Sequence, residues 1–205
     1  MQLVFATNNA NKLREAQQIL TNFEILGLKD AGIHDELPET HETILENSKE
    51  KAEYLYNKYH INCFSDDTGL EVEALNGAPG VYSARFAGPQ KNNDDNIALL
   101  LQKLQGVENR KARFVTYITL IINGKEHIFE GEMRGTILPY RTGNGGFGYD
   151  PVFQPEGYTQ SVAELSPEAK NQISHRGRSL QKMAEFLRSE DGSSANPNTL
   201  ENNTL

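Results

Sequence analysis

One Asn-Gly dipeptide near the middle of the chain constrains the fold more than any other feature. Residues 113–122 before it and residues 126–131 after it are rich in β-branched and aromatic side chains. Asn123-Gly124 between two such runs is the strongest short-range signal for a β-hairpin, because a two-residue hairpin turn needs positive φ angles that Asn and Gly adopt readily. The sequence therefore predicts a long antiparallel hairpin at the centre of the protein.

Helices and strands alternate before this hairpin. Residues 2–6 predict a short strand, and Lys12 opens an amphipathic helix after a polar turn. A capping box that begins at Thr43 starts a second helix, which ends before a strand at residues 61–65. Later helix starts are expected at Asp94 or Asp95, at Ser166-Pro167 and near Ser174. The mixture indicates an α/β protein with a mixed sheet.

Composition fits a globular protein that does not bind long nucleic acids. The 205 residues are 37% hydrophobic and 23% charged, and the formal net charge is −8. A protein that grips a nucleic acid polymer usually has a basic contact face, so the acidic balance argues against that class. We expect one domain over residues 1–188 and a disordered tail over residues 189–205, which are polar and poor in apolar side chains.

The chain also lacks the signals of membrane insertion and secretion. No apolar run approaches the ~20 residues that a membrane span requires, and residues 1–6 do not resemble a secretory signal. Cys63 is the single cysteine, so an intrachain disulfide is impossible, and its position within a strand predicts a core residue. We therefore expect a cytoplasmic protein with no membrane partner.

The turn before the first helix is a candidate phosphate site. A helix N-terminus offers free N–H groups and the positive end of a dipole, and Thr7, Asn9 and Lys12 lie at this one. The segment is neither a Walker A loop nor a dinucleotide fingerprint, because the required glycines are missing. The alternative interpretation is an ordinary surface turn with a solvated lysine.

Two adjacent carboxylates, Asp66 and Asp67, follow the strand at residues 61–65 and are expected to interrupt it within Asp66-Asp67-Thr68-Gly69. Neighbouring carboxylates repel each other unless a cation or hydrogen-bond donors gather there. Magnesium commonly takes one or two carboxylates together with substrate phosphates. Upstream carboxylates that could complete such a site are Glu39, Glu42 and Glu46. The alternative is a turn with two solvated aspartates.

Three further polar groups support a ligand site but each has an ordinary structural alternative. Asn47 and Lys51 share one helix face, which could equally be a solvent-facing surface of ion pairs. The glycines around Phe147 allow the backbone to approach a flat ligand, so that Phe147 could stack on a base and Asp150 accept from its edge. Near the last helix, the candidate donors to carbonyl or phosphate oxygens are Lys170, His175 and Arg176.

Taken together, these segments resemble the inosine triphosphate pyrophosphatase family, enzymes that remove non-canonical purine nucleoside triphosphates. The resemblance runs from Leu3 to about Leu187. It rests on these motifs in this order: Thr7-x-Asn9-x-x-Lys12; Glu46-Asn47-Ser48; Ser65-Asp66-Asp67-Thr68-Gly69; Gly77-Ala78-Pro79-Gly80-Val81-Tyr82-Ser83-Ala84-Arg85; Gly146-Phe147-Gly148-Tyr149-Asp150-Pro151; and Ser174-His175-Arg176-Gly177.

The resemblance implies an elongated, two-lobed α/β fold with a central mixed sheet flanked by helices, an active cleft between the lobes, and a homodimer. It implies that Mg²⁺ is held by Glu39 and Asp67, that Asp67 is also the base that activates water, that Thr68 contacts the substrate and that Lys51 reaches its phosphates. Triphosphate binding is implied for Thr7, Asn8, Asn9, Ala10, Asn11 and Lys12. The implied base pocket contains Phe147, Gly148, Tyr149, Asp150, Lys170, His175 and Arg176.

The sequence departs from the common pattern of this family at a few positions. Asn8 stands where many relatives have glycine, and Thr68 replaces a frequent serine while keeping the hydroxyl. The tail after residue 188 exceeds the family core. The role of Asp66, in assisting the metal or in holding the turn, is open at this point. The alternatives for function are a pyrophosphatase for modified pyrimidine or standard triphosphates, and a nucleotide sensor that binds without hydrolysis.

Overall fold

The computed structural model describes residues 1–193, and its centre is the predicted hairpin. Strands β5 (Lys111–Ile122) and β6 (Lys125–Ile137) pair in antiparallel register from Ile122↔Lys125 to Lys111↔Thr136. Asn123 and Gly124 have φ angles of 50° and 77°, the conformation that a tight hairpin turn requires. The hairpin is longer than the sequence pattern predicts, because the pairing continues past the β-branched run of β6.

A seven-stranded mixed sheet forms around this hairpin, in the order β2-β1-β3-β5-β6-β7, with β4 paired to β3. β1 is parallel to β2 and β3, whereas β3, β4, β5, β6 and β7 pair in antiparallel fashion. The bounds of the remaining strands are β1 (Gln2–Phe5), β2 (Glu24–Leu26), β3 (Cys63–Val72), β4 (Pro79–Gly80) and β7 (Phe153–Pro155). The predicted α/β class with a mixed sheet is confirmed.

β3 differs from its prediction. The strand does not stop at Ser65 but runs through Asp66 and Asp67 to Val72, so the expected break within Asp66-Asp67-Thr68-Gly69 is wrong. Asp66 and Asp67 pair with Ile118 and Tyr117 of β5. The ladder along the long hairpin supplies backbone hydrogen bonds that outweigh the low strand propensity of the polar segment.

The helices begin near the predicted positions and are α1 (Ala10–Ile19), α2 (Ile44–Tyr59), α3 (Asn93–Lys103), α4 (Pro167–Ile173) and α5 (His175–Ser193). Thr43 caps α2 by accepting from the N–H of Glu46, and Ser166 caps α4 with Pro167 at its first position. The cap of α3 is Asn92, not Asp94 or Asp95, which instead lie in the first turn, where the helix dipole favours acidic side chains.

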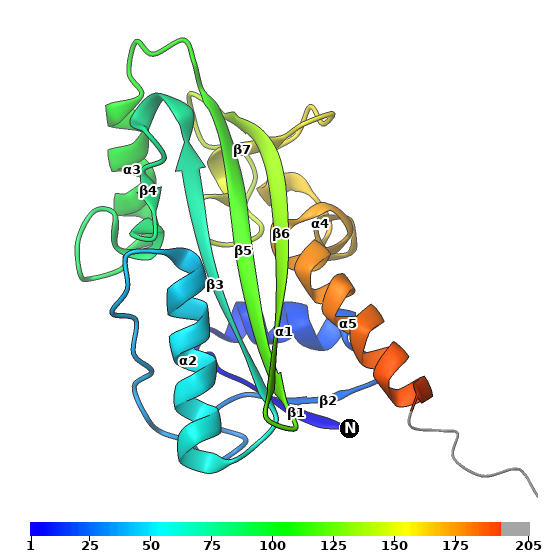
Figure 1. The fold of residues 1–205 in the computed structure, drawn as a ribbon. Coiled ribbons are helices and arrows are strands. Elements are labelled where there is room, and N and C mark those ends of the chain that lie inside the picture. The colour runs from blue at the N-terminus through cyan, green and yellow to red at the C-terminus, as the bar shows by residue number, and fades with distance from the viewer. Residues whose placement is uncertain (194–205) are drawn as a thin grey trace, which may run out of the picture.

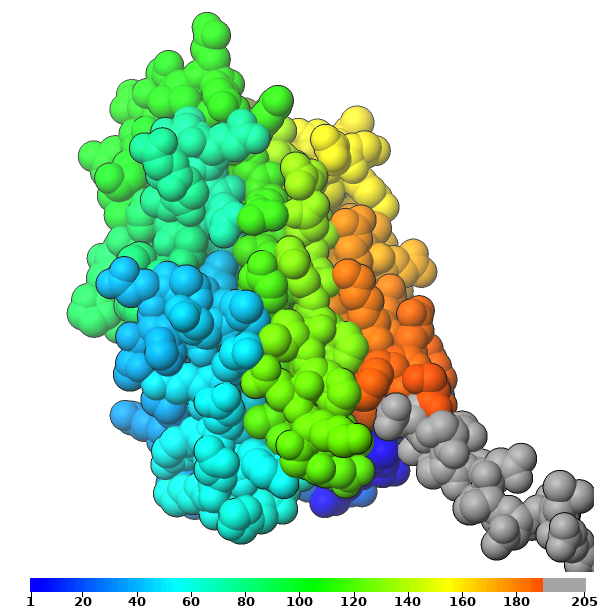
Figure 2. Space-filling model, viewed as in Figure 1, coloured from blue at the N-terminus to red at the C-terminus, as the bar shows by residue number. Residues whose placement is uncertain are grey.

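Packing divides the molecule into two lobes that share the long strands (Figure 1). α1, α2, β1 and β2 gather at one end of these strands, and α3, β4 and β7 at the other. We call the end with α1 and α2 the lower lobe and the end with α3 the upper lobe, as they are drawn in Figure 1. In the lower lobe, one apolar cluster joins α1 and α5 to one face of the sheet, and a second joins α2 to the other face. A third cluster fills the upper lobe. Figure 2 shows the resulting elongated shape, with the hairpin reaching across both lobes.

α5 crosses β6 closely because Gly131 has no side chain. A Cβ atom at Gly131 would lie 2.0 Å from the carbonyl oxygen of His175 and 2.7 Å from the N–H nitrogen of Ser179. This contact fixes the start of α5, and with it His175 and Arg176, against the centre of the sheet. α5 extends past the expected domain end at residue 188 to Ser193, and the rest of the expected tail lies outside the described residues. No helix within residues 1–193 is long and apolar enough to cross a bilayer.

Candidate active site

A gap along one edge of β3 is the structural origin of the site. β1 pairs with β3 only as far as Phe5↔Phe64, and β4 begins to pair at Leu70↔Gly80. Residues 65–69 of β3 therefore have no strand on that edge among the described residues. The side chains that meet this stretch come from the N-terminal turn of α1, from the face of α2 that carries Lys51 and from the start of α5.

Asp66 is a buried hub of this site, with 1% of its surface exposed. Its carboxylate accepts hydrogen bonds from Lys12 Nζ and from Arg176 Nε, both at 2.8 Å. Burial disfavours the charge, but the nearby cations of Lys12 and Arg176 hold the pKa of Asp66 well below its usual range. Asp66 therefore joins Lys12 of α1 to Arg176 of α5.

Asp67 points to the opposite face of β3, because successive side chains of a strand alternate. There Lys51 Nζ lies 3.2 Å from Asp67 Oδ1, 2.8 Å from Glu39 Oε1 and 2.8 Å from the carbonyl oxygen of Asp66. Burial raises the pKa of Asp67, and the charges of Glu39 and Asp66 act in the same direction, against the influence of the lysines. A carboxylate with this tendency to hold a proton is suited to proton transfer.

Glu39 and Asp67 are a suitable donor pair for a divalent cation. Both carboxylates already contact one ammonium group, that of Lys51. The described residues contain no group of three or more Asp, Glu, His or Cys side chains with the spacing of a metal site. Two carboxylates are the usual protein contribution when Mg²⁺ also binds substrate phosphates. Glu46, a candidate from the sequence, instead accepts a hydrogen bond from the hydroxyl of Thr43 at the start of α2.

The N-terminus of α1 is less open than the sequence suggests. Asn9 is the N-cap, and its Oδ1 accepts from the N–H groups of Asn11 at 2.9 Å and Lys12 at 3.3 Å. Thr7 Oγ1 accepts from the N–H of Asn9 at 3.1 Å. The structure thus uses the side-chain oxygens of Thr7 and Asn9 to hold the turn. Asn8 is not among the described residues with positive φ, so its replacement of glycine needs no left-handed backbone.

A second group of charges continues from Asp66 into the upper lobe. Arg176 Nη1 contacts Glu15 at 2.7 Å, Glu15 contacts Lys170 Nζ at 2.8 Å, and Lys170 contacts Asp150 at 2.8 Å. Glu15 was not among the sequence candidates. The available signal was its position three residues after Lys12, which places both side chains on one face of α1. Partial burial of Glu15 disfavours its charge, but the cations of Arg176 and Lys170 outweigh this cost and lower its pKa.

The glycine-rich loop brings Phe147 to these charges. Asp150 Oδ2 accepts from the N–H of Phe147 at 2.9 Å, which closes the loop, and Gly146 lies so near that a Cβ would be 2.1 Å from the same oxygen. Lys170 Nζ lies 4.5 Å and Arg176 Cζ 5.7 Å from the centre of the Phe147 ring. These contacts place one aromatic ring within the polar network.

Other members of the expected base pocket occupy different surroundings. The position of a Cβ on Gly148 has no atom within 4 Å among the described residues, so this part of the loop borders open space. Tyr149, in contrast, packs in the apolar core of the upper lobe and donates its hydroxyl to the carbonyl oxygen of Ser83 at 2.8 Å. The side chain of Tyr149 therefore supports the loop from the apolar core.

His175 and Thr68 complete the wall of the site. The imidazole of His175 is 4% exposed and stacks on Phe114 at 4.7 Å, while its Nδ1 has no hydrogen-bond partner among the described residues. Burial, reinforced by the cations of Arg176 and Lys170, holds the pKa of His175 well below its usual value, so the ring is neutral. Thr68 Oγ1 accepts from Arg176 Nη2 at 3.2 Å and lies 2.7 Å from Thr116 Oγ1 of β5.

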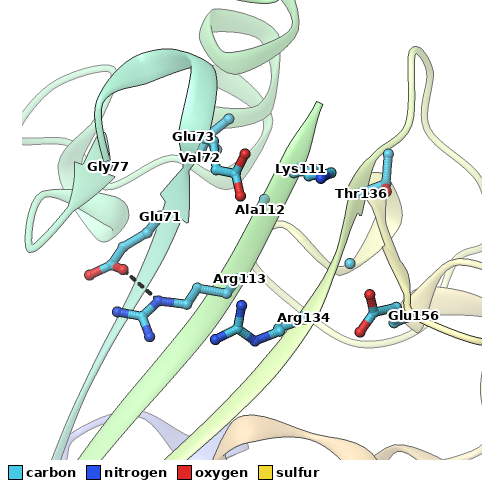
Figure 3. Close-up of a pocket in the computed structure, with 11 residues that line it drawn as sticks. Glu71, Val72, Glu73, Gly77, Lys111, Ala112, Arg113, Arg134, Thr136 and Glu156 are labelled. Atoms are coloured by element: carbon cyan, nitrogen blue, oxygen red, sulfur yellow. Dashed lines mark hydrogen bonds and ion pairs between the residues drawn. The ribbon is translucent and has the colours of Figure 1, made fainter. Parts of the chain in front are cut away.

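A separate hollow on the sheet surface is not this site. It measures about 480 Å³ and lies over the upper ends of β3, β5 and β6 (Figure 3). Arg113 there pairs with Glu71 at 2.7 Å and with Glu132 at 2.9 Å. The charge of Arg113 is thus matched by carboxylates on the same surface. The network around Asp66 and Asp67 is the stronger candidate because several of its charged side chains are buried.

Comparisons with known proteins agree with the geometry. The sequence model of the Ham1 family matches residues 3–186. The chain is 51% identical to the dITP/XTP pyrophosphatase of Flavobacterium psychrophilum, over 92% of this chain and 100% of that protein. It is also 51% identical to the dITP/XTP pyrophosphatase of Porphyromonas gingivalis, over 90% of this chain and 96% of that protein.

Solved structures give the same result. The Ham1 protein of Staphylococcus aureus superimposes with a TM-score of 0.85 at 36% identity, covering 93% of this chain and 100% of that one. The HAM1 protein of Coxiella burnetii superimposes with a TM-score of 0.84 at 33% identity, covering 92% of this chain and 99% of that one. The resemblance inferred from the motifs is confirmed, and with it the elongated, two-lobed fold. This chain belongs to the Ham1 family.

Proposed function

We propose that the protein is a nucleoside-triphosphate pyrophosphatase that hydrolyses ITP, dITP and XTP to the monophosphate and pyrophosphate, and thereby removes altered purine nucleotides. The observation that carries the proposal is the pair of lysines held by the two adjacent carboxylates of β3. Lys51 joins Asp67 to Glu39, and Lys12 is held by Asp66 at the start of α1. The two relatives at 51% identity are named dITP/XTP pyrophosphatases, which supports dITP and XTP as substrates.

The phosphate-binding end of the site would combine the cations of Lys12 and Lys51 with a general base, Asp67. A triphosphate carries close to four negative charges, so Lys12, Lys51 and the N-terminus of α1 would offset them. All three N–H groups of Lys51 already have acceptors, so Lys51 would exchange one of them for a phosphate oxygen. Substrate binding would in this way draw Lys51 away from Glu39 or Asp67.

Asp67 would take a proton from the attacking water. The oxygen of that water forms a bond to the α-phosphorus, the bond to the α–β bridging oxygen breaks, and pyrophosphate leaves. Glu39 and Asp67 would hold Mg²⁺, which when bound neutralises phosphate charge and orients the substrate. Arg176 and Lys12 would keep Asp66 ionised beneath the reaction.

The upper end of the cleft would recognise the purine. Phe147 would stack on the base, with Lys170 and Asp150 beside it. Inosine and xanthosine carry a carbonyl at the purine 6-position, where adenosine carries an amino group. A neutral His175 together with Arg176 would favour an acceptor there. Arg176 is 2% exposed and would also hold Asp66, Glu15 and Thr68 in place through its hydrogen bonds.

Pyrophosphate release with Mg²⁺ from a panel of inosine, xanthosine, adenosine, guanosine and pyrimidine triphosphates tests this function. We expect fast release from the inosine and xanthosine nucleotides. A preference for standard or modified pyrimidine triphosphates would refute the base-pocket assignment. Tight binding of every nucleotide with no release would make the protein a sensor.

Asp67→Asn tests the role of the base. It should lower kcat by ~10²–10⁴-fold, the usual loss on removing a general base. The control is Asp94→Asn, since the Asp94 side chain is 73% exposed on the surface of α3. Activity of Asp67→Asn above roughly a tenth of wild type would contradict the assignment.

We also propose that the enzyme acts as a homodimer in the cytoplasm. The dimer follows from the family resemblance, and the buried, unpaired Cys63 fits a reducing compartment. Light scattering of the purified protein tests the dimer: a monomer at micromolar concentration would exclude a stable one.

A further inference from the structure

The segment that carries Glu39 has no regular structure, yet it places one of the two proposed metal ligands. Residues 35–41, which we name the strap, form neither helix nor strand. The strap runs along α2 (Figure 1). Glu39 itself touches only Lys51 among its recorded hydrogen bonds, so the position of its carboxylate depends on how the neighbouring backbone is held.

The far end of the strap is tied by Asp35. Its Oδ2 accepts from the hydroxyl of Tyr54 at 3.1 Å, from Lys58 Nζ at 2.7 Å and from the hydroxyl of Tyr59 at 2.7 Å. Hydrogen bonds from Lys58 and Tyr59 lower the pKa of Asp35, which keeps this tie charged at neutral pH.

The near end is tied at the two residues that follow Glu39. Glu50 accepts from the N–H of Thr40 at 2.8 Å and from its hydroxyl at 2.7 Å. Asn47 accepts from the N–H of His41 at 2.9 Å and donates to the carbonyl oxygen of His41 at 3.1 Å. Each tie uses two hydrogen bonds, so it fixes orientation as well as distance.

The ties share one face of α2. Positions 47, 51, 54 and 58 are separated by three or four residues and so lie in a row along the helix, with position 50 adjacent. Lys51, which binds Glu39 and Asp67, belongs to the same row. A rigid helix can therefore set the strap and the lysine in one register against β3.

We infer that Glu50 and Asn47 are positioning residues that hold Glu39 opposite Asp67, so that the metal site is formed before substrate arrives. The inference rests on the proposed function, because it assumes that Glu39 and Asp67 hold the divalent cation. Glu50 acts through Thr40 and does not touch the carboxylates of the site. Its side chain is 22% exposed, so its loss opens no cavity in the core.

The test compares Glu50→Ala with Glu50→Gln, which can keep an acceptor for the Thr40 N–H, and with Glu53→Ala. Glu53 lies on the exposed side of the same helix, and its replacement by alanine removes the same charge. The first measurement is a Mn²⁺ titration without nucleotide, in which electron paramagnetic resonance detects the bound metal. We expect the Mn²⁺ affinity of Glu50→Ala to fall about tenfold, as is typical when a residue that orients a ligand is lost. Glu50→Gln should recover most of this loss, and Glu53→Ala should match wild type.

The second measurement reports on the strap without any metal. A glutamate-specific protease can cut after Glu36 and Glu39, and the cutting rate of the folded protein should rise several-fold in Glu50→Ala alone. Urea unfolding of each variant shows that global stability is retained. In the hydrolysis assay, half-saturation by Mg²⁺ should rise while kcat at saturating Mg²⁺ stays within about twofold of wild type.

Unchanged Mn²⁺ affinity or unchanged cutting in Glu50→Ala would overturn the inference, as would equal effects in Glu53→Ala. These outcomes leave the proposed function intact if wild type still releases pyrophosphate. A wild type without that activity would refute the proposed function instead, while the protease and Mn²⁺ measurements would still decide whether Glu50 holds the strap.

Discussion

Replacing Asp66 by asparagine keeps the shape of the side chain and removes one buried charge from the centre of the network. Lys12 and Arg176 each lie 2.8 Å from the Asp66 carboxylate. At the effective dielectric constant of about 20 that suits protein sites, each pair at this distance attracts by about 6 kcal/mol. Much of this attraction offsets the cost of removing the charges from water. Breaking a buried pair from one side costs about 3–5 kcal/mol, because the remaining cations are left without a counter-charge.

Urea unfolding at neutral pH measures this cost. We expect Asp66→Asn to lose about 3–5 kcal/mol of unfolding free energy with an unchanged denaturant slope. The control Asp94→Asn removes an exposed charge at the start of α3 that pairs with Arg141, and should cost no more than about 1 kcal/mol. Lys12→Met combined with Asp66→Asn should cost less than the sum of the two single changes, by about 0.5–3 kcal/mol. A loss below about 1 kcal/mol for Asp66→Asn would show that Asp66 does not bind the network together.

Three further predictions follow from single contacts. Gly131→Ala should lower the unfolding free energy by about 1–3 kcal/mol, because its Cβ would collide with the backbone of α5; a melting temperature equal to wild type would contradict that packing. The lowered pKa of His175 in the folded state means that only the unfolded chain gains a proton as the pH falls below about 6.5. The stability of wild type relative to His175→Gln should therefore be fully present above that pH and fall below it by up to about 1.4 kcal/mol per pH unit, and parallel stability curves between pH 7 and 5 would refute this. Phe147→Ala should raise KM for ITP by roughly 5–150-fold through the loss of about 1–3 kcal/mol of stacking, and an unchanged KM would remove Phe147 from the base site.

Much of the fold follows from local sequence signals. Asn123-Gly124 predicts the hairpin, and Thr43 and Ser166-Pro167 predict the starts of α2 and α4, because turn and cap chemistry acts within a few residues. The sequence also predicts Lys51, Asp66 and Asp67 as candidate site residues, and the structure brings these three together.

The way in which these residues are used depends on long-range packing. Pairing with β5 extends β3 through Asp66 and Asp67, and the alternation of the strand then sends the two carboxylates to opposite faces and different lysines. Packing of α1 against α5 brings Glu15 to Arg176, and packing of the upper lobe places Tyr149 in its apolar core. These contacts join residues far apart in the chain, and their free energy depends on burial and on partners that no local pattern specifies.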